Sequence, residues 1–344
     1  MTPAMRVLVT GGGGFLGRRI VRALLERGDD VVVAARSAYP EVQSWGASQV
    51  RGDLGEPDLA ARAVEGVDAV VHTAARAGVW GDYADYRRSN VAATANIVAA
   101  CRAHGVEHLV YTSTPSVTFD GTDHVGAGPD LPYASKHRTH YSATKAEAEK
   151  LVLGAEGVRA VALRPHLIWG PGDPFIFPGV IERHREGKLA RIGGGENRVD
   201  ITYVDNAAAA HVHALDALVG GANGVAGRAF FISDGEPVAL WPFLDELFAA
   251  RDLPPLRRRG PAGVAFGSGA VLETAHRVLR LEGEPRMTRF LAQQVSTSHW
   301  YDMAPAGEAL GYEPVVARAE AWARTVEDLR ARGLCGRGGD GLEG

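Results

Sequence analysis

A tyrosine and a lysine stand one helical turn apart in the segment YSATK at residues 141–145. Because side chains at positions i and i+4 share one face of a helix, the phenol of Tyr141 and the ammonium of Lys145 are predicted to point into one cleft. A free phenol has a pKa near 10, and lowering that pKa by about three units requires roughly 4 kcal/mol of differential stabilisation. A neighbouring ammonium in a dry site is a source of that stabilisation. Tyr141 is therefore predicted to act as a general acid or base on a carbonyl or hydroxyl group, with Lys145 as its partner.

A run of hydroxyl side chains precedes this helix, in YTSTPSV at residues 111–117. It follows a predicted strand, and the carboxyl ends of the strands in an open parallel sheet line the ligand crevice. Thr114 is the first choice for holding the substrate oxygen beside the phenol, and Ser113 is the second. The alternative is that these hydroxyls satisfy backbone groups at the strand end, which suits Thr112 and Ser116 better.

A glycine-rich loop, TGGGGFLG at residues 10–17, lies between a predicted strand and a predicted helix. Gly11 permits the tight turn, Gly14 lets backbone amides approach a pyrophosphate, and Gly17 lets the helix pack on the strand. The phosphates of a dinucleotide would face the helix N-terminus. The positive charge of its nicotinamide, when oxidised, would add to that of Lys145 in lowering the pKa of Tyr141. The alternative is a merely flexible loop. The predicted cofactor contacts of this loop are Gly11, Gly14, Phe15, Leu16 and Gly17.

The end of the second strand indicates which dinucleotide is bound. NAD enzymes usually carry an acidic residue there for the ribose 2′-hydroxyl, and this chain has alanine at position 35. Arg36 is placed to meet a 2′-phosphate, and Ser37 could add a hydroxyl. NADP(H) is therefore the preferred cofactor, with NAD(H) possible if Arg36 is only a solvated surface residue.

Two further segments are predicted to contact the cofactor. Asp53 and Leu54 follow the third strand, where they can meet the adenine, although Asp53 could equally cap a turn. The small residues Thr73, Ala74 and Ala75 follow the fourth strand and permit close approach of the cofactor. Their alternative role is strand-end packing.

The elements around these motifs alternate between strands and helices, which is typical of an α/β fold with a parallel sheet. Strands are predicted at 6–10, 31–34, 50–52, 68–73, 109–112 and 160–163, with helices after residue 14 and over 83–103. We expect a Rossmann-type doubly wound parallel sheet with a smaller, discontinuous C-terminal substrate domain. The predicted division assigns 1–165 and 198–218 to the NADP(H)-binding domain, 166–197 and 219–332 to the substrate-binding domain, and 333–344 to a disordered tail.

Composition narrows the functional class. The net charge is −4 without a long basic block, which argues against a nucleic-acid partner. The two cysteines, Cys101 and Cys335, are far apart and have no neighbouring metal ligands, so we expect no metal and a reduced, cytoplasmic setting. No signal peptide or membrane span is predicted. The segment 261–281 is interpreted as an amphipathic helix that lines an apolar pocket.

The motifs occur in a characteristic order. TGGGGFLG, GDL at 52–54, HTAA at 72–75, Asn90, YTSTPSV, YSATK and RPHLIWGPGDP at 164–174 together resemble the extended short-chain dehydrogenases, and within them the 3β-hydroxysteroid dehydrogenase branch. STPSV and RPHLIWGPGDP resemble sterol-4α-carboxylate 3-dehydrogenases. AARAGVWGDY at 74–83 and HWYDM at 299–303 resemble bacterial 2-alkyl-3-oxoalkanoate reductases.

This resemblance implies an NAD(P)-dependent oxidoreductase acting on a 3-oxo/3-hydroxy pair of a bulky hydrophobic β-keto acid or sterol. It implies Tyr141 as acid/base, Lys145 as its partner, Thr114 as the family's hydroxyl residue and Asn90 as a contributor to the cofactor site. Ala93 departs from the usual NVxGT pattern after Asn90. A homodimer is also implied by the resemblance.

The substrate side of the site is expected after residue 164. Pro165, Ile168 and Trp169 are candidates to wall the nicotinamide, with a rigid turn and a core aromatic as the alternatives. A substrate carboxylate requires a basic partner, and the candidates are His166 and the basic residues at 136, 137, 138 and 140. For those four, the alternative is a solvated loop.

Three other functions are weighed against the reductase. An NAD-dependent, decarboxylating sterol-4α-carboxylate 3-dehydrogenase shares the motifs. A nucleotide-sugar epimerase or dehydratase uses the same Tyr/Lys pair but favours an acid at position 35. A non-catalytic NADP sensor would normally lose Tyr141 or Lys145, and both are present.

Overall fold

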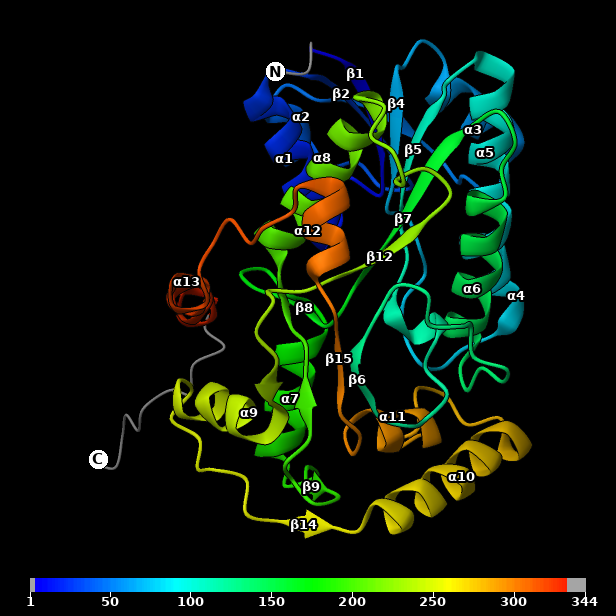
Figure 1. Ribbon diagram of the computed structural model, residues 1–344. Coiled ribbons are helices and arrows are strands. Elements are labelled where there is room, and N and C mark those ends of the chain that lie inside the picture. Colours follow the sequence, from blue (N-terminus) through cyan, green and yellow to red (C-terminus); the bar gives the residue numbers. More distant parts are fainter. Residues whose placement is uncertain (1–3, 333–344) are drawn as a thin grey trace, which may run out of the picture.

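A seven-stranded parallel sheet forms the centre of the computed structural model, which describes residues 4–332 (Figure 1). Its strand order is β12-β7-β5-β4-β1-β2-β3. The strands are β1 (Arg6–Thr10), β2 (Asp30–Ala35), β3 (Ser48–Arg51), β4 (Ala69–His72), β5 (His108–Thr112), β7 (Arg159–Pro165) and β12 (Ala229–Ile232). The order reverses between β1 and β4, and a ligand crevice is expected at the carboxyl ends of strands beside such a switch point.

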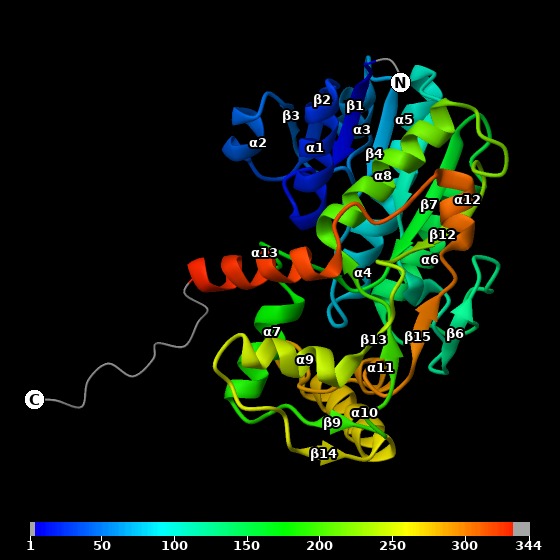
Figure 2. The ribbon, with the colours of Figure 1, turned by 60° about the vertical axis from the view of Figure 1, so that its left-hand side comes forward.

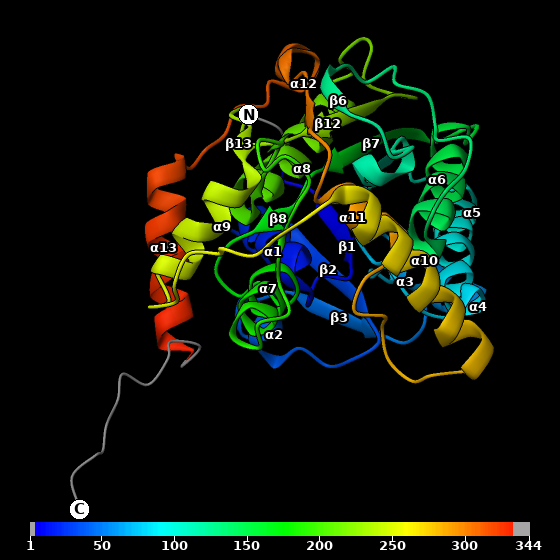
Figure 3. The ribbon, with the colours of Figure 1, turned by 90° about the horizontal axis from the view of Figure 1, so that it is seen from below.

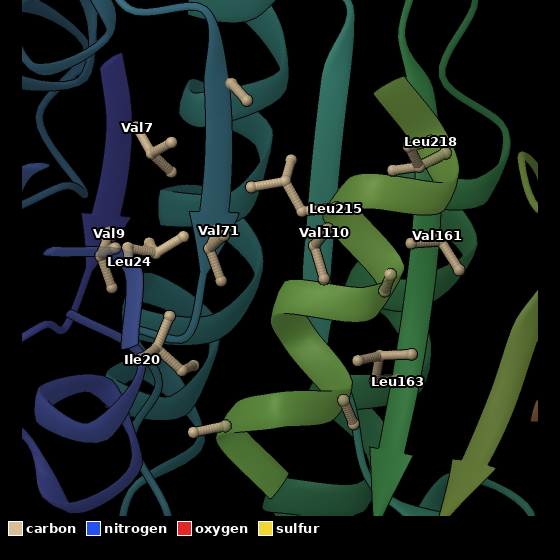
Figure 4. Packing of buried hydrophobic residues seen from close by; sticks show 14 of the residues in the cluster. Val7, Val9, Ile20, Leu24, Val71, Val110, Val161, Leu163, Leu215 and Leu218 are labelled. Carbon is tan, nitrogen blue, oxygen red and sulfur yellow. The ribbon is translucent and has the colours of Figure 1, made fainter. Parts of the chain in front are cut away.

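Helices cover both faces of this sheet. One face carries α1 (Phe15–Arg27), α2 (Pro40–Ser44), α8 (Val204–Val219) and α12 (Ala304–Leu310), and the other carries α3 (Pro57–Val64), α5 (Ala93–His104) and α6 (His140–Leu153). Leu215 and Leu218 of α8 pack over the strands that contain Val110 and Val161 (Figure 4). These layers make the doubly wound architecture expected from the sequence.

The strand sequences explain this arrangement. In β2, Val31 and Val33 belong to the hydrophobic cluster on one face of the sheet, whereas Val32 belongs to the cluster on the other face. Strands covered on both faces are continuous apolar runs of β-branched residues, because successive side chains point to opposite sides. Gly28, in the left-handed conformation with φ of 97°, ends α1.

The second part of the molecule lies beyond the carboxyl ends of the main strands (Figures 1 and 2). Its helices are α7 (Ile176–Arg185), α9 (Leu240–Ala249), α10 (Ala262–Leu279), α11 (Arg289–Gln294) and α13 (Arg318–Ala331). Its short strands are β6 (His124–Ala127), β8 (Ile168–Trp169), β9 (Arg191–Ile192), β10 (Arg198–Val199), β11 (Thr202–Tyr203), β13 (Val238–Ala239), β14 (Arg259–Gly260) and β15 (His299–Tyr301). Seen from this side, α7, α9, α10 and α11 lie in front of the sheet (Figure 3).

Two predictions about the elements need correction. Strand β3 begins two residues before the predicted 50–52. The predicted substrate-binding range 219–332 contains β12, which instead pairs with β7 in the main sheet. Its sequence AFFI is a short, fully buried run without alternation, so periodicity does not distinguish it from a helix fragment. The rest of the domain division stays a prediction, and the predicted tail, 333–344, lies outside the described residues.

The segment 261–281 is helical, as predicted, and forms α10. None of the α10 residues lines the large cavity described below, so its predicted role as a pocket wall is wrong. Within residues 4–332, no helix combines the length and the apolar character needed to cross a membrane.

Candidate active site

A cavity of about 880 Å³ opens at the carboxyl ends of β1, β2, β4, β5 and β7. Almost every site residue predicted from the sequence lines it. They are Gly11, Gly14, Phe15, Leu16, Gly17, Arg36, Ser37, Asp53, Leu54, Thr73, Ala74, Ala75, Ser113, Thr114, Tyr141, Lys145, Pro165 and His166. Asn90 and Trp169 do not.

The glycine-rich loop forms a cradle that a side chain would fill. A Cβ on Gly17 would lie 2.2 Å from the carbonyl oxygen of Gly11, and one on Gly11 would lie 3.0 Å from the backbone of Ala74. Gly14 is the N-cap of α1 and offers no side-chain cap, so the first amides of the helix remain open to a ligand. This combination fits the pyrophosphate of a dinucleotide.

A buried hydrogen-bond chain that the sequence reading missed fixes the strand ends beneath the loop. The Thr10 hydroxyl pairs with His72 Nδ1 at 2.6 Å, and His72 Nε2 pairs with the Thr94 hydroxyl at 2.9 Å. Burial lowers the pKa of His72 to about 3, so the ring stays neutral, with one nitrogen accepting and the other donating. Thr10 Oγ1 also accepts from the amide of Thr73 at 3.1 Å, which ties β1 to the loop after β4.

The end of the cavity next to β2 and β3 carries Arg36 and Asp53. Arg36 follows β2 and is exposed on the cavity wall. The Asp53 carboxylate accepts from the amide of Gly55 at 2.8 Å and from Arg88 at 3.0 Å. These contacts, the Gly55 amide first, hold the pKa of Asp53 below its usual value. Asp53 thus caps a turn, which is the alternative to an adenine contact given above, and it also forms an ion pair with Arg88.

Asn90 is a brace between two segments of the site. Its Oδ1 accepts from the amide of Arg76 at 2.7 Å, and its Nδ2 donates to the Arg76 carbonyl at 3.1 Å and to the Thr144 hydroxyl at 3.0 Å. The side chain is buried, and these partners fully engage its amide. The predicted contribution of Asn90 to the cofactor surface is therefore corrected to a positioning role.

Tyr141, Lys145 and Thr114 meet on one wall of the cavity. Helix α6 begins at the N-cap Thr139, whose hydroxyl accepts from the amide of Ser142 at 3.0 Å, and this fixes the tyrosine in the first turn. Lys145 Nζ donates to the carbonyl of Thr112 at 2.5 Å. The i, i+4 spacing therefore brings the phenol and the amine to the same site.

Burial controls the protonation of this pair. Burial raises the pKa of Tyr141 to about 12, against an opposing hydrogen bond from Thr114. Burial lowers the pKa of Lys145 to about 7, against the opposing charge of Glu149. In the protein alone the phenol pKa is thus raised, because a phenolate would lose its hydration here. The predicted lowering, which also depends on the positive charge of an oxidised nicotinamide, stays a prediction. The resting phenol is protonated.

Ser113 offers an unused polar group. Its side chain is buried on the cavity wall, and among the described residues its Oγ has no hydrogen-bond partner. Buried hydroxyls are normally paired, because an unpaired one is costly. Ser113 is therefore available to a ligand next to Thr114 and Tyr141.

The protonation of His166 is set by its neighbours. His299 Nε2 donates to the carbonyl of Gln294 at 2.7 Å, so in the neutral ring His299 Nδ1 accepts from His166 Nε2 at 2.6 Å. Burial lowers the pKa of both histidines. His166 is thus neutral and leaves only an accepting Nδ1, which is unsuited to a carboxylate.

The other predicted carboxylate partners lie elsewhere. Lys136, His137, Arg138 and His140 do not line the cavity. Arg138, for example, donates to Gln293 at 3.2 Å. The prediction that these residues bind a substrate carboxylate finds no geometric basis.

Trp169 is a core residue. It is buried and packs its ring against Phe177, Tyr203 and Phe243, with centroid distances of 5.5–5.9 Å. The predicted role of Trp169 as a nicotinamide wall is therefore replaced by the alternative, an aromatic core. Pro165 and Ile168 are on the cavity wall.

The described residues also lack a set of ligands that meets the requirements of a metal site. Across residues 4–332, no group of three or more His, Cys, Asp or Glu side chains is arranged to hold a metal ion.

Comparison with known proteins gives consistent matches. Residues 8–258 match the 3-beta hydroxysteroid dehydrogenase/isomerase family. A 2-alkyl-3-oxoalkanoate reductase of Stenotrophomonas maltophilia is 50% identical over 320 residues, which cover 92% of this chain and 97% of the relative. The human decarboxylating sterol-4-alpha-carboxylate 3-dehydrogenase is 34% identical over 339 residues, covering 95% and 89%. Among solved structures, MoeE5 in complex with UDP-glucuronic acid and NAD has a TM-score of 0.71 and 26% identity, covering 95% and 99%.

Proposed function

The chain belongs to the 3-beta hydroxysteroid dehydrogenase/isomerase family, and from that premise we propose that it uses NADPH to reduce the 3-oxo group of a 2-alkyl-3-oxo acid. Membership makes it an NAD(P)-dependent oxidoreductase, and its similarity to 2-alkyl-3-oxoalkanoate reductases supports a 3-oxo substrate. The observation that carries the finer proposal is the protonated, half-buried phenol of Tyr141 beside Lys145 on the wall of the glycine-lined cavity.

The residues present fit a dinucleotide. The open amides at the start of α1 would bind the pyrophosphate, and Arg36 would bind a 2′-phosphate. Alanine at position 35 provides no carboxylate for a ribose 2′-hydroxyl, which favours NADPH over NADH. When bound, the dinucleotide supplies the hydride for the reduction.

The chain itself handles the proton. Thr114 and Ser113 would orient the ketone oxygen by hydrogen bonds, and the Tyr141 hydroxyl would transfer its proton to that oxygen as the alcohol forms. The ammonium of Lys145 would stabilise the phenolate that remains until a solvent proton replaces the one transferred. One hydride and one proton then balance the reduction of the ketone to the alcohol.

Substrate choice tests the proposal directly. NADPH absorbance is followed with 2-butyl-3-oxooctanoic acid, and NAD(P)⁺ reduction is followed with a 4α-carboxysterol. We expect turnover of the keto acid with NADPH to exceed turnover of the sterol. Faster turnover of the sterol with NAD⁺ would instead identify a decarboxylating dehydrogenase of the second relative's type.

The phenol is tested by Tyr141→Phe. Since general acid catalysis contributes about 10²- to 10⁴-fold, the rate should fall by that factor while NADPH still binds. Tyr83→Phe is the matched control, because Tyr83 is 43% exposed and lies off the cavity wall. Turnover by Tyr141→Phe at the parent rate would refute the mechanism. The homodimer and the cytoplasmic location stay predictions.

A further inference from the structure

Four basic side chains of the described residues, apart from the neutral His166, line the cavity: Arg18, Arg36, Arg76 and Lys145. Three of them already have a place in the cofactor or catalytic machinery. Arg18 lies beside the glycine loop, where its Nε donates to the Gly14 carbonyl at 3.4 Å. Arg36 follows β2, and Lys145 donates to the backbone of β5. Arg76 is left without a role in the proposed reaction.

The main chain of Arg76 is held rigidly. Asn90 binds both its amide and its carbonyl, so the start of the side chain is fixed relative to the helical segment that contains Asn90 and to α6. The guanidinium lies 5.3 Å above the ring of Tyr86, and its Nη1 is 3.3 Å from Asp85. Arg76 and Asp85 are 42% and 58% exposed, and exposed pairs of this kind contribute little stability. An incoming anion can therefore replace Asp85 at low cost.

The ring beneath this guanidinium adjoins the start of α6, at the catalytic end of the cavity. Tyr86 belongs to α4 (Tyr83–Tyr86), and its ring centroid is 6.3 Å from that of His140, the residue before Tyr141. The phenol of Tyr86 is also close enough to raise the pKa of Tyr141. The Arg76 guanidinium thus lies over α4, and α4 contacts α6, at whose start the reacting ketone is expected.

A β-keto acid carries its carboxylate two carbons from the ketone, so a cation must lie near the phenol to bind it. We propose that Arg76 binds the substrate carboxylate in place of Asp85 while Tyr141 acts on the ketone. This inference rests on the proposed function. Arginine presents two parallel N–H groups that match a carboxylate, and the neutral His166 cannot compete for it.

Binding of a non-reacting pair of ligands tests the proposal apart from turnover. In the presence of NADPH, affinity is measured for 2-butyl-3-hydroxyoctanoic acid and for its uncharged methyl ester by titration calorimetry. Arg76→Gln should weaken binding of the acid on the order of 10- to 100-fold and change binding of the ester by less than about threefold. In kinetics with the keto acid, KM should rise while kcat changes little.

Two further variants separate recognition from structure. Asp85→Asn frees the guanidinium and should tighten binding of the acid. Weaker binding of the acid in this variant would show that the ion pair only supports the loop, and would overturn the proposal. Arg138→Gln is the matched control, because Arg138 lies off the cavity wall and should leave the acid-to-ester ratio unchanged.

The outcomes separate this inference from the proposed function. If Arg76→Gln weakens binding of the acid and of the ester equally, or weakens binding of NADPH, the role of Arg76 is overturned even if the enzyme reduces the keto acid. Selective loss of the acid would support Arg76 even if the parent enzyme fails to reduce the ketone. A parent enzyme that binds neither ligand would overturn both.

Discussion

Replacing Lys145 with methionine should stabilise the apoprotein while it inactivates the enzyme. Burial lowers the pKa of Lys145 from an ordinary value of 10.5 to about 7. The folded protein therefore binds fewer protons than the unfolded chain between these values, and stability rises with pH across that window. The penalty for burying the ammonium is full below pH 7 and disappears above about pH 10.5. Methionine has a similar length and carries no charge to bury.

The size of the effect follows from two opposing contributions. The difference between the two pKa values, at about 1.4 kcal/mol per pH unit, corresponds to a destabilisation of roughly 5 kcal/mol when the buried Lys145 is charged. Methionine also leaves the carbonyl of Thr112 without the donor it has at 2.5 Å, which costs about 1–3 kcal/mol. Lys145→Met should thus gain about 2–4 kcal/mol at pH 6.5 and lose most of that advantage by pH 9.5.

Guanidinium unfolding followed by tryptophan fluorescence measures this difference in the free energy of unfolding. Parent and variant are compared without cofactor at pH 6.5 and pH 9.5, and NADPH oxidation is assayed in parallel. A variant less stable than the parent at pH 6.5 would refute the reasoning. So would an advantage of the same size at both pH values, because the gain would then have no connection with protonation.

Three other changes test the cofactor site and the core behind it. Arg36→Ala should reduce the ratio of kcat/KM with NADPH to kcat/KM with NADH by on the order of 10- to 100-fold, since it removes a charged hydrogen bond to the 2′-phosphate. Gly17→Ala puts a Cβ 2.2 Å from a loop carbonyl and should abolish NADPH binding in fluorescence titrations, whereas Gly128→Ala, with no atom within 4 Å, should not. Glu149→Gln should lower the free energy of unfolding by about 3–5 kcal/mol, because the buried guanidinium of Arg164 loses the carboxylate that lies 2.6 Å away. A double variant that also carries Arg164→Met should recover most of this loss of stability.

The sequence was sufficient to predict most strands of the main sheet and most of the residues that line the cavity at its edge. The position of a motif at the end of a strand predicts where it lies in the fold, because parallel strands bring their carboxyl ends to one edge of the sheet. The glycine loop after β1, Arg36 after β2 and Thr114 after β5 therefore meet in one cavity although they are far apart in the chain. The i, i+4 rule added Tyr141 and Lys145 to the same wall.

The substrate side was less predictable, because it depends on contacts between distant segments. Arg76 directly follows the predicted motif at 73–75, but nothing in its local sequence shows that it reaches α4. His166 is a candidate cation from its sequence alone, but it forms a hydrogen bond to His299, 133 positions away, as a neutral ring. Trp169 looked like a ligand wall, and only the packing of three aromatic residues from distant segments identifies it as core.

The protonation of the two central residues bears on the proton transfer in the proposed mechanism. A phenol with a pKa near 12 holds its proton at neutral pH, so Tyr141 is ready to donate to a ketone without prior ionisation. Oxidation of the alcohol needs the phenolate first, and at neutral pH the protein alone disfavours that form. An amine with a pKa near 7 is charged in about half of the molecules at that pH, and a developing phenolate would favour the charged form further. In the proposed mechanism, Tyr141 is thus neutral at rest, and Lys145 becomes more fully charged as the proton moves to the ketone.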